Sequence, residues 1–505
     1  MISLRETMRG GRRIDQSRPW PRHVVDQTGW LRAIREISKG HGDMLGLWSD
    51  GADVHMAVLD RESSDIAIVT IECPNGCFPS VGHMHPPALR LERAIRDIYG
   101  LRAEGLPDTR NWLDHGRWGV RHPGARPEPC EASGDSYAFL AAEGVPLHQI
   151  PVGPVHAGII EPGHFRFSAN GEVVVRLEER LGYVHKGTEQ LMVRAPLDRA
   201  ARLAGRVSGD STVAYALAFA KAVESSLDIE VPRRAVYLRA LMAELERIAN
   251  HVGDIGAICN DASFSLMHTH CAILRERILR TASVCFGHRL MMDRVAPGGV
   301  ATDLSIEGEG ALRALLSDAK RLIPRFIQLY GDTTSIQDRT VGAGHLRADL
   351  ANQYGCGGVI GRASGRGFDA RRSPGYAPYS ELSFKVGSAH AGDVDARVWV
   401  RFDEVKESLG LIEQILDKMP AGPVSTDSLP ASSEGSEGAA LVESFRGDIL
   451  VWVRIGATRT VQRCHLRDSS WFQWPLLEAV IEGNIVADFP LLNKSFNCSY
   501  SGHDL

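Results

Sequence analysis

The sequence predicts an α+β protein in which a small N-terminal α/β domain precedes a larger, mainly helical domain. Two observations indicate the α/β domain: residues 65–73 are rich in β-branched side chains between turn residues, and residues 89–100 predict a helix that ends at Gly100. The third observation is a series of long segments with helical periodicity in the second half of the chain. We therefore expect the first domain to cover residues 26–120 and the second to cover residues 151–505.

The segments outside these elements lack the patterns of regular structure. Residues 1–25 are polar and basic, and they are predicted to be disordered. Residues 121–150 include a stretch dense in Pro, Gly and charged side chains, which indicates a linker between the two domains. Residues 421–440 are rich in Ser, Gly and Pro and predict a flexible surface insertion in the second domain.

The second domain is predicted to begin with a β-hairpin and to continue as helices. Asn170-Gly171 lies between two alternating segments, as in the two-residue turn of a hairpin. The clearest helix covers residues 233–253, and residues 271–292 and 309–331 have a similar pattern, typical of helices that pack in a bundle. The apolar positions of the first helix are Leu238, Leu241, Leu245, Ile248 and Val252. Its opposite face carries Arg239, Glu246 and Arg247.

Composition and charge exclude several classes of function. The net charge of −5 comes from 57 basic and 62 acidic side chains, so no positive field favours nucleic acid. No apolar run approaches the ~18–20 residues that span a bilayer, and the arginine-rich N-terminus lacks the apolar core of a secretory signal. The nine cysteines are scattered, which suits a reducing compartment. We expect a cytoplasmic protein whose membrane association depends on partner subunits.

Four stretches carry long, ordered motifs that point to a known family. They are VGPVHAGIIEPGHFRF (152–167) with LGYVHKGTEQLM (181–192), residues 215–257, and IEGNIVADFPLLNKSFNCSYSGHDL (481–505). Together they resemble the large subunit of group 4 nickel–iron hydrogenases and its relative, the 49 kDa subunit of respiratory complex I. Residues 86–113 resemble the signature of the complex I 30 kDa subunit. The chain therefore resembles a fusion of the two subunits, which is familiar in group 4 hydrogenases and in some forms of complex I.

The resemblance implies two C-x-x-C pairs that hold nickel and iron, and both pairs are missing from this chain. In register with I-E-V-P (229–232), the first pair falls on Ser208 and Ser211, and the second falls on Ser499 and Gly502. Thiolates suit these soft metals, and serine hydroxyls do not replace them. We therefore expect that this chain binds no cofactor of its own and no nickel. The resemblance places a 4Fe-4S cluster in a neighbouring partner subunit.

Three residues are candidates for a proton relay that does not need a metal. The glutamate that matches Glu161 in group 4 hydrogenases lies beside the metal pocket and relays protons. The alternative is that Glu161 pairs with Arg166 or Arg206 to hold its loop. Asp210 is an acidic group beside the lost ligands, and it either carries protons or caps the helix that follows.

The third candidate, His164, stands for the histidine with which complex I binds the quinone head group. The tyrosine that completes that quinone site falls on Gly209 in this chain. We therefore do not expect these two positions to bind a quinone head group in the way that complex I does. A quinone stays a candidate ligand of the chain.

The resemblance implies a subunit of a membrane-associated, ion-translocating oxidoreductase complex related to NADH-quinone oxidoreductase and to group 4 hydrogenases, without nickel–iron chemistry. The expected partners are a small iron–sulfur subunit and antiporter-like membrane subunits, with no nucleic acid. The expected location is peripheral, on the inner face of the plasma membrane. Two alternatives stay open: a non-catalytic scaffold subunit of such a complex, and an active hydrogenase large subunit.

Overall fold

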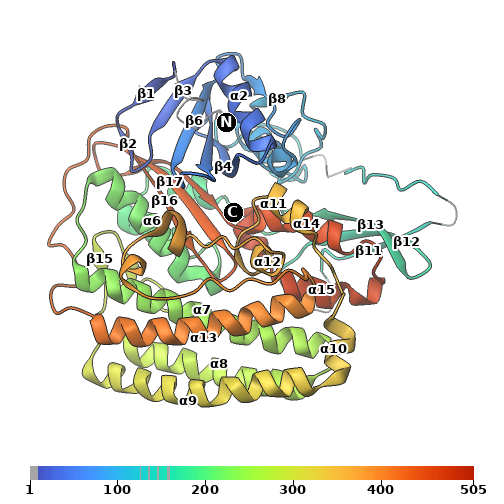
Figure 1. The fold of residues 1–505 in the computed structure, drawn as a ribbon. Helices are drawn as coiled ribbons and strands as arrows, with labels where there is room; N and C mark the ends of the chain where they lie inside the picture. Colours follow the sequence, from blue (N-terminus) through green and yellow to red (C-terminus); the bar gives the residue numbers. More distant parts are fainter. Residues whose placement is uncertain (1–9, 126, 133, 135–136, 145–146, 156–159) are drawn as a thin grey trace.

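The N-terminal part of the chain is built around a five-stranded sheet with the order β1-β3-β6-β5-β4. The computed structural model describes residues 10–505, except 126, 133, 135, 136, 145, 146 and 156–159. The strands are β1 (Arg12–Ile14), β3 (Arg22–Val25), β4 (Gly42–Ser49), β5 (Asp53–Asp60) and β6 (Ile66–Glu72). Figure 1 shows this sheet at the top of the molecule, with α2 (Gln27–Ser38) and α3 (Leu89–Tyr99) beside it. The predicted strand and helix of this domain are therefore confirmed.

Local chemistry explains where these two helices begin and end. Asp26 caps α2 by accepting a hydrogen bond from the Gly29 amide at 2.8 Å. Gly100 ends α3 because its φ of 74° is left-handed, a conformation that glycine adopts without a steric penalty. The buried side of α3 includes Leu91 and Ile95, which pack into the main hydrophobic core.

Residues 12–25 lie in the segment that was expected to be disordered, but they form three short strands. β2 (Ser17–Arg18) pairs in parallel with β16 (Ser436–Glu443), which belongs to the large domain. Arg22 forms a buried ion pair with Glu437 of that strand at 2.8 Å. The main-chain pairing of β2 thus comes from a distant strand, while β1 pairs with β3 and β3 with β6. Composition does not report such pairing.

A second sheet, with the order β18-β17-β16-β2, lies beneath the first (Figure 1). Its long strands are β16, β17 (Asp448–Ile455) and β18 (Val461–Arg467). Trp48 of the first sheet packs in one apolar cluster with Leu450 and Trp452 of the second. Residues 436–440, the last part of the expected flexible insertion, are buried in β16.

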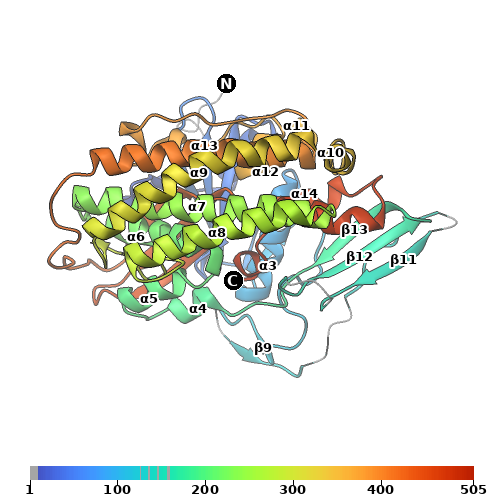
Figure 2. The same ribbon diagram turned by 90° about the horizontal axis from the view of Figure 1, so that it is seen from below.

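The helices of the large domain form layers on the other side of the second sheet. α6 (Thr212–Leu227) packs directly on β16 and β17. Below it lie α7 (Arg233–Asp261) and α13 (Val394–Lys418), followed by α8 (Ser265–Phe286) and α9 (Ile306–Asp332) (Figures 1 and 2). The three helices predicted from periodicity correspond to α7, α8 and α9, although α8 begins and ends earlier than predicted.

A three-stranded sheet projects from one side of the molecule (Figure 2). It contains β11 (His148–Val152), β12 (His164–Asn170) and β13 (Val173–Arg180). β12 and β13 form the predicted hairpin, and Gly171 in its turn has a φ of 59°. The chain then finishes with α14 (Ser470–Val480), α15 (Phe489–Phe496) and α16 (Tyr500–Asp504).

The remaining elements are short. They are α4 (Thr188–Met192), α5 (Leu197–Ala204), α10 (Thr334–Thr340), α11 (Ala348–Gln353), α12 (Gly358–Ala363), β7 (Cys77–Pro79), β8 (Arg102–Glu104), β9 (Val120–Arg121), β10 (Glu128–Pro129), β14 (Val295–Ala296), β15 (Gly299–Val300), η1 (Pro86–Ala88), η2 (Gly209–Ser211), η3 (Arg371–Gly375), η4 (Tyr379–Glu381) and η5 (Val486–Asp488). In the described part of the chain, no helix combines the length and the apolar character that crossing a membrane requires. The α+β fold class predicted from the sequence is confirmed.

Candidate functional site

The positions of the missing cysteines come together where the start of α6 meets α16. Ser208 lies at the N-terminus of η2, and Ser499 is the N-cap residue of α16. The Ser499 hydroxyl is 3.4 Å from the Ser208 hydroxyl, although the two residues are 291 positions apart in the sequence. Ser499 also accepts a hydrogen bond from the Gly502 amide at 2.8 Å. The register used to place the lost ligands therefore corresponds to one site in space.

An ion pair between Arg446 and Asp210 occupies this site. Arg446 lies in the turn between β16 and β17, and its guanidinium donates to both carboxylate oxygens of Asp210, at 2.9 and 2.6 Å. The same guanidinium donates to the Ser211 hydroxyl at 3.1 Å and to the Asn497 carbonyl at 2.5 Å. Arg446 thereby connects the two segments that carry the lost ligand positions.

Both members of the Arg446–Asp210 pair are charged at neutral pH. Burial favours the neutral form of Asp210, but the charge of Arg446 and its hydrogen bonds outweigh burial and lower the pKa of Asp210 to about 2. The Ser208 hydroxyl adds a further hydrogen bond to Asp210 at 2.7 Å. Asp210 is therefore a carboxylate at neutral pH, held by a cation, which is unfavourable for a group that must take up protons there.

These residues do not fit a nickel–iron centre. Hydroxyls and a glycine replace the four soft thiolates, and a guanidinium cation lies among them. A Cβ atom at Gly502 would lie 2.7 Å from a carboxylate oxygen of Asp468, so a cysteine there requires a shift of its neighbour. Within the residues that the structure describes, no cluster of three or more His, Cys, Asp or Glu side chains is arranged to hold a metal ion.

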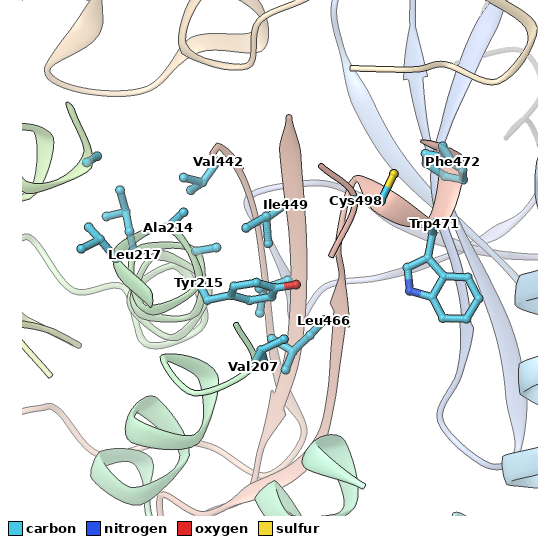
Figure 3. Packing of buried hydrophobic residues seen from close by; sticks show 14 of the residues in the cluster. Val207, Ala214, Tyr215, Leu217, Val442, Ile449, Leu466, Trp471, Phe472 and Cys498 are labelled. Carbon is cyan, nitrogen blue, oxygen red and sulfur yellow. The ribbon is translucent and has the colours of Figure 1, made fainter. Parts of the chain in front are cut away.

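Cys498 is the thiol next to a lost ligand position, and it belongs to the hydrophobic core. In Figure 3, Cys498 lies on the hydroxyl side of Tyr215, and Tyr215 lies next to Ile449 and Leu466. The Cys498 sulfur is 3.9 Å from the side-chain carbonyl oxygen of Gln473, and burial raises the pKa of the thiol well above its ordinary value. The pKa shift favours the neutral thiol over the thiolate that metals bind.

The capping role considered for Asp210 belongs instead to Glu246 of α7. Ser211, the N-cap residue of α6, makes no side-chain cap bond, and the amides of Val213 and Ala214 donate to Glu246 at 2.7 and 3.1 Å. Burial raises the pKa of Glu246 to about 8, against the effect of the two amide bonds. Sequence reasoning missed Glu246 because a distant glutamate that caps a helix leaves no local pattern.

Glu161 pairs with neither of the arginines that the sequence suggested. Its carboxylate accepts a hydrogen bond from the Ser501 amide at 3.0 Å, so it caps the first turn of α16. Arg206 instead forms an ion pair with Asp293 at 2.6 Å, and Arg166 donates to His164 at 3.3 Å. The Glu161 side chain is solvent-exposed. Its loop is therefore held by the backbone of α16.

His164 lies at the start of β12, with both ring nitrogens engaged. Nδ1 is 3.1 Å from the Gly153 carbonyl, and Nε2 accepts the bond from Arg166. Burial lowers the pKa of this imidazole. Gly209, at the position of the family's quinone tyrosine, is exposed, and a Cβ there would meet nothing within 4 Å. The two positions therefore do not offer the pair of hydrogen-bonding side chains that the family's quinone site uses.

The three relay candidates lie around the start of α6 and α16, but they do not form a chain. Among the described residues, no hydrogen bond joins any two of Glu161, His164 and Asp210. The motif after the hairpin serves instead to hold α16. Asp504 accepts bonds from the amides of Gly182 and Val184 at 2.9 and 3.0 Å, and its carbonyl contacts His185 at 2.7 Å.

Comparisons with known proteins agree with the fold. Residues 37–132 match the family described as the 30 Kd subunit of respiratory-chain NADH dehydrogenase, and residues 261–436 match the 49 Kd subunit of the same enzyme. The chain is 31% identical to formate hydrogenlyase subunit 5 of Escherichia coli over 85% of this chain and 77% of that protein. It is also 31% identical to hydrogenase-4 component G of the same species, over 94% of this chain and 84% of that protein.

A further relative is the fused C/D subunit of NADH-quinone oxidoreductase from Bacteroides thetaiotaomicron, which is 28% identical over 86% of this chain and 84% of that protein. An α/β domain joined to a layered helical domain is the architecture of a large subunit of the complex I and hydrogenase type. The chain belongs to the family of fused 30 kDa and 49 kDa complex I-type subunits that includes hydrogenase-4 component G. The resemblance seen in the motifs is thereby confirmed.

Proposed function

We propose that this chain is a subunit of a membrane-associated, ion-translocating oxidoreductase complex and that it works without a nickel–iron centre. The observation that carries the proposal is the Arg446–Asp210 ion pair at the position of the family's metal. Relatives at similar identity are subunits of hydrogenases, of an F(420)H(2) dehydrogenase and of NADH-quinone oxidoreductases. In this proposal the chain assembles with other subunits in such a complex, but it carries out no nickel–iron chemistry.

In this proposal the chain lies next to a small iron–sulfur subunit and reaches the inner face of the plasma membrane through antiporter-like subunits. The chain would receive electrons from the partner's 4Fe-4S cluster or transmit a conformational change. The hairpin, the segment 181–192 and α16 support this arrangement, because in the family these parts line the contact with the iron–sulfur subunit. A quinone would need hydrogen-bonding groups other than His164 and residue 209.

Purification of the tagged chain from its own host in mild detergent tests the proposal. We expect an iron–sulfur subunit and membrane proteins to copurify, with iron present and with much less than one nickel per chain. Serine hydroxyls at three ligand positions and a glycine at the fourth are the physical reason for the low nickel. A lone monomer would contradict the complex, and about one nickel per chain would contradict the loss of metal chemistry.

A scaffold subunit is the second candidate function, and the contact of Glu161 favours it. An exposed carboxylate that accepts a bond from the Ser501 amide has a structural role whether or not protons move. The active hydrogenase alternative has no such support, since the donor atoms at its metal site are missing.

Glu161→Gln separates a proton carrier from a scaffold. The amide oxygen of glutamine still accepts the bond from Ser501, so we expect the free energy of unfolding to change by less than about 0.5 kcal/mol. If Glu161 carries protons, turnover of the complex should fall by at least about ten-fold, at the low end for acid–base groups because water reaches this side chain. A stable complex with an unchanged rate would remove Glu161 from the mechanism and favour the scaffold.

A further inference from the structure

Two glutamates share one arginine at the seam between the N-terminal part and the large domain. Arg90 of α3 donates through Nη1 to Glu179 of β13 at 3.1 Å and through Nη2 to Glu478 of α14 at 2.7 Å. The same Glu478 carboxylate accepts the main-chain amide of Glu179 at 2.7 Å. The two carboxyl groups are therefore held against a single guanidinium by elements from three parts of the chain.

The charges of this group do not balance if both carboxyl groups are ionised. Glu179 is only 1% exposed, and one of its oxygens, Oε1, is buried without a hydrogen-bond partner among the described residues. The neighbouring Glu178 has its own cation, Arg110, at 2.5 Å. Two carboxylates with one arginine would leave a net negative charge in the interior, which is costly, whereas a proton on one of them removes it.

The other charged groups around Glu179 and Glu478 have partners of their own. Arg93 forms an ion pair with Asp108 at 3.0 Å and donates to Tyr137. The Arg90 guanidinium lies 4.5 Å from the centre of the Trp112 ring, which shields one of its faces from water. Arg180, a buried cation 6.0 Å from the centre of the same Trp112 ring, donates to the carbonyls of Asn111 and Asp114. The remaining titratable groups around the pair are Glu178, Arg110, Arg176, Tyr137, Tyr354, Glu482, Cys498, Tyr500 and His503. Arg110 is occupied by Asp108 and Glu178.

The pair lies between solvent and the interior. A cleft of about 310 Å³, lined by Arg90, Tyr354, Glu478 and Glu482 among others, opens on the outer side, and the Glu478 side chain is 24% exposed there. Burial raises the pKa of Glu179 most, and the charge of Glu478 raises it further against the effect of Arg90. On the inner side, burial raises the pKa of Tyr500 in α16 most, and the charges of Glu179 and Glu161 raise it further.

We propose that Glu179 and Glu478 form a proton-binding pair that holds one proton at neutral pH and exchanges it with water in the cleft. Glu478, which reaches the cleft, takes up and releases the proton without any redox step. Holding the proton follows from the local charges alone. A role of this proton in turnover rests on the proposed function.

The pH dependence of stability tests whether the pair holds a proton. A carboxyl whose pKa is raised in the folded protein stabilises the fold below its unfolded pKa, and that contribution is lost as the pH rises through the folded pKa. The unfolding equilibrium constant of the full chain should therefore rise between about pH 5 and 9, by about ten-fold for each unit of pKa elevation. Glu179→Gln and Glu478→Gln should each reduce this rise, although Glu246, whose pKa burial also raises, keeps a part of it. Glu178→Gln, the matched control with its own arginine, should leave the rise unchanged.

Infrared spectroscopy detects the protonated carboxyl group directly. The full chain at neutral pH should show a protonated carboxyl band that shifts in D₂O, and a component of this band should disappear in Glu179→Gln and in Glu478→Gln but not in Glu178→Gln. If Glu179→Gln does not fold, Glu478→Gln carries the test, because its side chain is partly exposed. An unchanged band together with an unchanged pH dependence in the two pair variants would overturn the proposal.

Turnover of the complex tests whether the proton held by the pair is used. Glu179→Gln should slow turnover by at least about ten-fold, and Glu178→Gln should leave it within about two-fold. A lost band with an unchanged rate would overturn the role in turnover while the proton-holding pair stands. Failure of the proposed function is distinguishable from both results, since in that case no complex assembles although the band and its loss in the variants are observed.

Discussion

Replacing Arg446 with methionine is expected to lower the free energy of unfolding by about 3 kcal/mol. Methionine keeps much of the side-chain volume but leaves the Asp210 carboxylate without its cation, and breaking a buried pair from one side costs about 3–5 kcal/mol. We expect the lower end of that range because the Asp210 side chain is 34% exposed, so water recovers part of the loss. Urea denaturation of the full chain measures the change.

A double-mutant cycle with Asp210→Asn provides the control. Each single variant leaves one charge unpaired, whereas the double variant removes both, so its destabilisation should be smaller than the sum of the two. The pair's contribution should be present above about pH 4 and lost as the pH falls through about 2, because the folded pKa of Asp210 is the lower one. Additive single effects would show that the Arg446–Asp210 contact contributes nothing to the site.

Replacing Arg362 with methionine is expected to cost about 4 kcal/mol or more. Arg362 of α12 is fully buried and donates to Glu404 of α13 at 2.7 Å and to Glu443 of β16 at 2.9 Å. The variant removes the cation that these two carboxylates share and leaves Glu443 buried without its ion-pair partner. This loss should exceed that of Arg446→Met because no member of the group reaches solvent.

Thermal and urea unfolding of Arg362→Met, compared with Arg347→Met, measure this effect. Arg347 also forms an ion pair with an acidic residue, Asp349, but both side chains are about 70% exposed (71% and 67%), so its loss should change stability by less than about 1 kcal/mol. Equal destabilisation by the two variants would show that the buried charge cluster is not a main contributor to the fold.

The two predictions test different parts of the structure, the candidate site and the packing around it. Arg446 is specific to the candidate site, because it joins the start of α6 to the segment before α16. Arg362 belongs to the frame that places β16, and with it the turn that carries Arg446, against α12 and α13. In the proposed function, which uses no nickel–iron centre, the Arg446 guanidinium connects the start of α6 to Asn497.

Local patterns in the sequence were sufficient for the elements that depend on neighbouring residues. The strand at 65–73 corresponds to β6, and the helix ends at Gly100 because only the residue itself decides whether a left-handed φ is tolerated. The hairpin turn at Asn170-Gly171 follows from the same kind of local preference. Such features are encoded within a few positions, so a single sequence reveals them.

Pairing between distant segments was not visible in the sequence. β2 pairs with β16 across most of the chain, so a polar and basic segment became ordered where composition indicated disorder. In α7, Arg239, Glu246 and Arg247 lie on the face opposite the apolar stripe, but they are buried because further elements pack against that face as well. Periodicity identifies one buried face, and it does not report that a second face is covered.

The sequence by itself determined the family, the fold class and the absence of thiolates at Ser208, Ser211, Ser499 and Gly502, since these depend on residue identity and order. Only the tertiary structure decided which side chains meet at these positions. Arg446 meets Asp210 across 236 positions, and Glu246 rather than Asp210 caps α6. Ion pairs and caps between distant residues arise from packing, which brings a charge and its partner together without leaving any spacing between them that a sequence pattern can detect.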